Sequence, residues 1–148
     1  MKREYSAQPL VGVGGIVVRE GRILLVKRRN ELGRGKWSIP GGLVELGETL
    51  EQAVIREVKE ETSLDVESPQ YIDVVDNIDR DEKGRVRYHF VIVDCLVRPK
   101  GGEARVGSDA EEVEWVALDE VEDRELTKTF RLFFKRNVLK LRTPQNST

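Results

Sequence analysis

The segment at residues 42–64, GLVELGETLEQAVIREVKEETSL, constrains this chain more than any other part of the sequence. It predicts a helix from about Thr49 to Thr62, because Thr49 and Gln52 have the spacing of a capping box. Apolar residues recur along the segment at helical spacing, so one face of the helix is expected to pack inward.

Three glutamates of this predicted helix, Glu57, Glu60 and Glu61, stand at i, i+3 and i+4 and therefore share one face. At about 100° per residue they project beside the apolar stripe and not onto the solvent side. The stripe consists of Leu50, Ala53, Val54 and Val58, and the opposite face carries Gln52, Arg56 and Lys59. Unpaired carboxylates in such a position are costly. Arg56 can pair with Glu60 at i+4, which leaves at least two acids without an obvious partner. The projection therefore predicts a divalent metal ion such as Mg²⁺, which prefers hard oxygen ligands, over a solvated acidic face.

The same residues resemble the Nudix box, a pattern with glycine, glutamate and Arg-Glu at set positions. The matching positions here are Gly42, Glu48, Arg56, Glu57, Val58, Glu60, Glu61, Ser63 and Leu64. The family usually has glycine where Ser63 stands, because a left-handed residue ends the helix there, and serine adopts that conformation at a cost of about 1 kcal/mol. Every charged position of the box is present, so this departure removes no ligand.

The resemblance implies an α/β fold of the Nudix type, an α/β/α sandwich with a mixed sheet between helices. It implies a hydrolase that depends on Mg²⁺, with Mn²⁺ as the alternative ion. The metal ligands carry over onto Gly41, through its carbonyl, and onto Glu48, Glu57, Glu60 and Glu61. Arg56 would orient these glutamates by ion pairing.

Two further groups of residues are candidates for the chemistry. Glu111 and Glu112, in an expected loop before Trp115, are candidates for the general base, with Glu61 as their competitor on the helix. Basic residues before the Gly-Gly turn are suited to bind substrate phosphates, although solvated loop charges explain them equally well. These basic residues are Arg28, Arg29, Arg34 and Lys36.

The resemblance also bears on the substrate, because the family hydrolyses diphosphate linkages in nucleoside diphosphate derivatives. The layout is similar to short ADP-ribose pyrophosphatases, which favours ADP-ribose, cleaved to AMP and ribose 5-phosphate. These members often carry a proline beyond the box, and residues 77–82 contain none. A (d)NTP pyrophosphatase acting on normal or damaged nucleotides therefore stays open as the alternative. A non-catalytic nucleotide sensor is the third hypothesis, and the intact box argues against it.

The remaining chain predicts strands and a second helix. We expect a hairpin of strands 11–18 and 23–26 with a turn at 19–22, strands at 70–76, 88–97 and 113–118, a chain break at 99–102, and a closing helix at 126–141. Strands interleaved with two helices fit one Nudix hydrolase domain over residues 1–148, with 143–148 as a loose tail.

Charge and composition exclude several classes of protein. A formal net charge of -2 lacks the basic excess of a nucleic-acid binder. The apolar runs are too short for a membrane span and the first ten residues are too polar for a signal peptide, so we expect a cytoplasmic protein. The lone cysteine, Cys95, is expected to be a buried thiol. Family resemblance makes a homodimer an open option.

Overall fold

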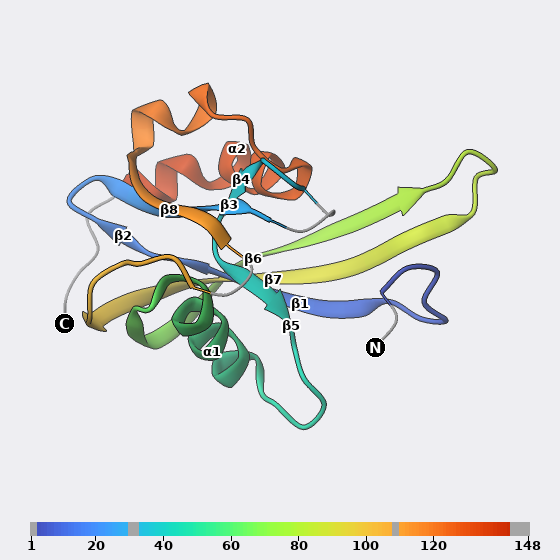
Figure 1. Cartoon of the computed structure of the whole chain (residues 1–148), viewed down its shortest axis with the longest axis horizontal. Coiled ribbons are helices and arrows are strands. Elements are labelled where there is room, and N and C mark those ends of the chain that lie inside the picture. The colour runs from blue at the N-terminus through green and yellow to red at the C-terminus, as the bar shows by residue number, and fades with distance from the viewer. Residues whose placement is uncertain (1–2, 30–32, 108–109, 143–148) are drawn as a thin grey trace.

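The structure is a computed structural model that describes residues 3–29, 33–107 and 110–142. In chain order its elements are β1 (Leu10–Ile16), β2 (Val18–Arg19), β3 (Arg22–Arg28), β4 (Trp37–Ser38), β5 (Gly41–Leu43), α1 (Leu50–Thr62), β6 (Asp65–Arg80), β7 (Val86–Gly101), β8 (Ala110–Ala117), the 3₁₀ helix η1 (Leu118–Asp123) and α2 (Lys128–Arg142). Figure 1 shows the sheets between α1 on one side and α2 on the other. The expected α/β/α sandwich is confirmed.

The mixed sheet has the strand order β5-β1-β7-β6. Strand β1 runs parallel to β7 and antiparallel to β5, while β6 and β7 form an antiparallel hairpin. In this register Gly14 of β1 lies between Gly41 of β5 and Asp94 of β7. The sheet therefore brings the Gly-Gly pair of β5, which precedes α1, close to the middle of a strand that lies far along the chain.

The second sheet corrects the hairpin expected at residues 11–18 and 23–26. Only β2 of the first segment pairs with β3, through Val18 with Ile23 and Arg19 with Arg22. The chain leaves the mixed sheet after Ile16 and enters a second, antiparallel sheet, in which β3 pairs with β2, β4 and β8. The local turn signal was right, but a turn cannot reveal that the preceding strand belongs to another sheet.

Strands β6 and β7 are longer than the sequence indicated. Each has 16 residues, and together they form the hairpin that extends away from the sandwich in Figure 1. The expected break at 99–102 is wrong, because Pro99 pairs with Val66 and β7 continues to Gly101. Pairing of β1 with β7 ends at Leu96, so Pro99 lies beyond the part of β7 that is paired on both sides, where proline is tolerated.

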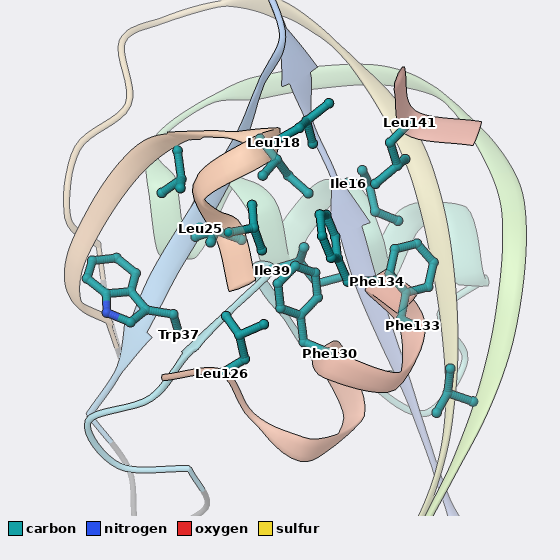
Figure 2. Packing of buried hydrophobic residues seen from close by; sticks show 14 residues of the cluster. Ile16, Leu25, Trp37, Ile39, Leu118, Leu126, Phe130, Phe133, Phe134 and Leu141 are labelled. Atoms are coloured by element: carbon teal, nitrogen blue, oxygen red, sulfur yellow. The ribbon is translucent and has the colours of Figure 1, made fainter. Parts of the chain in front are cut away.

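Two apolar clusters hold the layers together. On the α1 side, Val54 and Val58 pack with Val13 and other strand residues. On the α2 side, Phe130, Phe133 and further apolar residues form the cluster drawn in Figure 2. The expected closing helix is confirmed, although it begins at Lys128 after the unexpected η1. The expected tail at 143–148 lies outside the described residues, and none of the described helices is long and apolar enough to cross a membrane.

Candidate functional site

Helix α1 begins and ends as its sequence predicts. The Thr49 hydroxyl accepts from the Gln52 N–H at 3.1 Å, and the Gln52 side chain accepts from the Thr49 N–H at 2.9 Å, which completes the capping box. At the other end Ser63 is left-handed, with φ 67°, and its N–H donates to the Lys59 carbonyl. Serine therefore supplies the helix end that glycine usually makes, and the box helix keeps its expected length.

Arg56 joins the carboxylates on one flank of this helix. Its Nε and Nη2 donate to the two carboxylate oxygens of Glu48 at 2.6 and 2.9 Å. Its Nη1 donates to Glu57 at 2.8 Å and to Glu60 at 3.3 Å, so the expected i, i+4 pair is confirmed. A further bond, from Nη2 to the Leu43 carbonyl at 3.1 Å, ties the helix to β5. Arg56 thus positions three of the predicted ligands at once.

Glu61 is the most deeply buried of the acids, with its side chain only 3% exposed. Arg28 of β3 donates to Glu61 Oε2 at 2.5 Å, and the Gly41 N–H donates to Oε1 at 2.6 Å. Burial raises the pKa of Glu61 to about 7, although Arg28 and the Gly41 N–H lower it. This carboxylate is therefore held by an arginine that comes from the second sheet.

Glu57 lies directly against the glycines of β5. A Cβ added at Gly42 would stand 2.6 Å from the Glu57 carboxyl carbon, so only glycine leaves this acid its place. The Glu57 side chain is 13% exposed, and burial raises its pKa against the opposing effect of Arg56. Gly42 therefore leaves the space that the Glu57 carboxylate occupies.

The helix projection was wrong for two residues. Glu60 was expected to face the interior, and its side chain is 47% exposed. Arg56 was assigned to the solvent face, yet its side chain is only 23% exposed and points into the carboxylates. The reason is that Glu48 and β5 cover that flank of the helix, which an isolated helix projection cannot show.

The carboxylates fit a divalent cation by charge and ligand chemistry. The four predicted glutamate ligands (Glu48, Glu57, Glu60 and Glu61) pair with two guanidinium groups, those of Arg28 and Arg56. This leaves a net negative charge on hard oxygen donors, the ligand type that Mg²⁺ prefers. Within the described residues, no three acidic, histidine or cysteine side chains converge on one point. Arg28 and Arg56 instead pair with these acids, so a bound ion would share the carboxylate oxygens with the arginines.

A cavity of about 430 Å³ opens beside the carboxylates. Glu57, Glu61, Arg28 and Lys36 line one part of it, and β1 and β5 contribute glycines. Other lining residues come from β6, β7 and α2, namely Val75, Asn77, Asp79, Tyr88, Phe90, Ile92, Asp94, Lys128, Phe130 and Phe133. Its volume is that of a small-molecule site, and it combines charged and aromatic walls.

The predicted phosphate-binding residues divide into two groups. Arg28 and Lys36 line the cavity. Arg28 is also engaged by Ser38 Oγ and the Ile39 carbonyl, each at 2.9 Å from its guanidinium. Arg29 is exposed and donates to the Ala110 carbonyl at 3.2 Å, and it does not line the cavity.

Glu111 and Glu112 are not in a loop, as the sequence suggested, but in strand β8. Glu112 pairs with Lys27 at 3.3 Å, and neither acid lines the cavity. The loop interpretation was wrong because the strand expected from Val113 begins three residues earlier, at Ala110. From there β8 pairs with β3. Residues 108 and 109 of the expected loop lie outside the described part of the chain.

The sequence interpretation missed Asp94, which lines the cavity and is only 3% exposed. An acid inside the apolar run HFVIVDCLV was the available signal, since a buried charge in a central strand needs a reason. Its neighbour Cys95 is buried as expected, and burial raises the pKa of its thiol to about 11. Cys95 is therefore poorly suited to act as a nucleophile.

Comparison with known proteins places these features in context. Residues 8–136 match the model of the NUDIX domain. The chain is 42% identical over 118 residues to the ADP-ribose pyrophosphatase of Methanocaldococcus jannaschii, a match that covers 80% of this chain and 68% of that protein. It is 40% identical over 125 residues to a MutT-like protein of Streptomyces ambofaciens, covering 82% of this chain and 74% of that protein. The crystal structure of a MutT NUDIX hydrolase from Burkholderia pseudomallei has 38% sequence identity and a TM-score of 0.77, covering 86% of this chain and 97% of that one.

Proposed function

Because this chain belongs to the NUDIX domain family and is a Nudix hydrolase, we propose that it hydrolyses the diphosphate linkage of ADP-ribose to AMP and ribose 5-phosphate. The observation that carries this proposal is the shared cavity, in which the carboxylates Glu57 and Glu61 and the aromatic Tyr88 and Phe90 line one space. Carboxylates suit a diphosphate that carries Mg²⁺, and aromatic side chains suit a nucleobase. The identity to an ADP-ribose pyrophosphatase supports the choice of substrate.

The metal in this proposal is Mg²⁺, with Mn²⁺ as the alternative. Glu57, Glu60 and Glu61 would hold it, with the Gly41 carbonyl and Glu48 completing the ligand set. When bound, the ion supplies charge neutralisation of the diphosphate and a water of lowered pKa. Arg56 keeps Glu48 and Glu57 in position through its bonds to both carboxylates.

The chain's own residues then account for the proton and for the phosphate charges. Water oxygen forms a bond to one phosphorus, and the bond from that phosphorus to the bridging oxygen breaks. The water proton passes to a carboxylate, for which we assign Glu61, since it lines the cavity while Glu111 and Glu112 do not. Arg28 and Lys36 offer positive charge on the cavity wall toward the phosphates.

A substrate panel tests the function. AMP release from ADP-ribose is measured with Mg²⁺ and again after chelation, beside (d)NTPs, nucleotide sugars and dinucleoside polyphosphates. We expect ADP-ribose to give the highest kcat/KM and chelation to abolish turnover. If the protein binds nucleotides but turns over none of the panel, the result would contradict the enzymatic function and favour a nucleotide sensor.

A matched pair of variants tests the metal site. Glu60→Gln removes a proposed ligand whose side chain is 47% exposed, so the variant should keep the native fold, and kcat should fall by on the order of 100-fold. Glu51→Gln removes an exposed acid from the first turn of the same helix and should leave kcat unchanged. Equal activity of the two variants would contradict the ligand assignment.

A (d)NTP pyrophosphatase is the second candidate. Two relatives favour it, the MutT-like protein of Streptomyces ambofaciens and the MutT NUDIX hydrolase of Burkholderia pseudomallei. In that case the panel should show pyrophosphate release from a triphosphate at a higher kcat/KM than AMP release from ADP-ribose.

A further inference from the structure

Asp94 is a buried acid with no evident structural task. It lies in the middle of β7, is 3% exposed and lines the cavity. Across residues 3–29, 33–107 and 110–142, no hydrogen bond or ion pair reaches its side chain. A carboxyl group so deeply buried ordinarily has a partner, because burial without one is costly.

The neighbouring acid shows what a structural role looks like here. Asp73 of β6 pairs directly with Asp94 in the sheet. Its two carboxylate oxygens accept from Arg136 at 2.6 Å and from Asn137 at 2.7 Å, both on α2. Helix α2 therefore supplies a donor to each carboxylate oxygen of Asp73 and none to Asp94 beside it.

The Asp94 carboxyl group faces the cavity. Within the described residues, every fully enclosed side-chain nitrogen or oxygen has a hydrogen-bond partner. The Asp94 oxygens have none, so they must border open space, and the cavity is the space that Asp94 lines. A Cβ at Gly14 would stand 2.5 Å from Asp94 Oδ1, so the glycine of β1 leaves room for the carboxyl group.

The residues around Asp94 indicate which kind of ligand group can bind beside it. Phe90 and Ile92 precede it on the same face of β7, and Phe130 and Phe133 of α2 also line the cavity. Figure 2 shows these two phenylalanines beside each other at the start of α2. Such walls suit a flat aromatic ring, while an acid repels a phosphate. Burial, with Asp73 beside it, raises the pKa of Asp94 to about 7, against the opposing effect of Arg136.

From this geometry we propose that Asp94 is a specificity-determining residue that accepts a hydrogen bond from the exocyclic amino group of an adenine ring bound in the cavity. The proposal rests on the proposed function, since an adenine nucleotide is taken to be part of the substrate. It assigns the aromatic end of the cavity to the base and leaves the carboxylates of α1 to the diphosphate.

Binding of two nucleotides by titration calorimetry tests the assignment without turnover. The ligands are AMP and purine riboside 5′-monophosphate, which lacks only the amino group. The wild-type protein should bind AMP about 10- to 100-fold more tightly, the range expected for a hydrogen bond to an ionisable partner in a buried site. Asp94→Ala should bind the two ligands equally. Asp94→Asn should retain a preference for AMP, because the amide oxygen still accepts and the side chain keeps its size.

Asp76→Asn is the matched control, because Asp76 is an exposed acid on β6 and does not line the cavity. It should keep the wild-type preference. Equal affinity of the wild-type protein for both ligands, no binding of AMP at millimolar concentration, or an unchanged preference in Asp94→Ala would each overturn the assignment. A preference that depends on Asp94 in a protein without ADP-ribose hydrolysis would refute the proposed function and leave the assignment standing.

Discussion

Arg56→Met tests whether one arginine holds the carboxylate cluster in its native arrangement. In the native protein Arg56 satisfies both oxygens of Glu48, at 2.6 and 2.9 Å, and one of Glu57, at 2.8 Å. The side chains of Glu48 and Glu57 are each 13% exposed, so water cannot fully replace the guanidinium. Methionine keeps much of the length and apolar contact of the arginine stem while removing the charge.

The magnitude follows from the burial. Removing one partner of a fully buried ion pair costs about 3–5 kcal/mol, and the 23% exposure of Arg56 allows some screening, so we expect about 2–4 kcal/mol. Lys59→Met is the control on the same helix, because Lys59 and its partner Asp65 have 53% and 49% of their side chains exposed. Such an exposed pair contributes about 0–1 kcal/mol.

Urea denaturation of both variants at pH 7 and pH 4 measures the difference. Arg56 lowers the pKa of Glu48 below its usual 4.5, so this pair stabilises the fold above that pH and the stabilisation is lost as the pH falls. The deficit of Arg56→Met relative to the wild-type protein should therefore shrink at pH 4. A deficit no larger than that of Lys59→Met, or one that grows on acidification, would refute this reasoning.

Three further variants extend the predictions. Asp94 has a native pKa of about 7 against an ordinary value of 3.8, so the native state loses stability as the pH rises between these values. Asp94→Asn cannot ionise, so its free energy of unfolding should exceed that of the wild-type protein by up to about 4 kcal/mol at pH 8 and should be similar at pH 4. Thermal melts across this pH range measure the difference, and a parallel dependence of stability on pH in the two proteins would contradict it. Gly42→Ala places a Cβ 2.6 Å from the Glu57 carboxyl group and should lower kcat at least about 10-fold with Mg²⁺ present, whereas unchanged kinetics would show that Glu57 can move freely. Phe133→Ala should cost about 3–5 kcal/mol in chemical denaturation, because Phe133 is 1% exposed in the α2 cluster, and a loss below 1 kcal/mol would contradict its role in the core.

Local spacing was enough to predict the box helix, since Thr49, Gln52 and Ser63 act within one or two turns of the chain. It was not enough to predict strand pairing. The signal for a turn at residues 19–22 was correct, yet β1 joined β5 and β7 in another sheet. The expected loop at Glu111 and Glu112 was wrong for the same reason, because the pairing of Glu112 with Lys27 depends on how β8 meets β3, and these two residues are 85 positions apart in sequence.

By itself the sequence determined that Glu57, Glu60 and Glu61 stand together, because positions i, i+3 and i+4 of a helix share a face wherever the helix lies. Only the tertiary structure decided how deeply each is buried: Glu61 is enclosed by Arg28 from a strand 33 residues away, while Glu60 remains exposed. The role of Asp94 is likewise visible only after folding, because whether a buried acid meets a donor or an open cavity depends on the packing of β7 against α2.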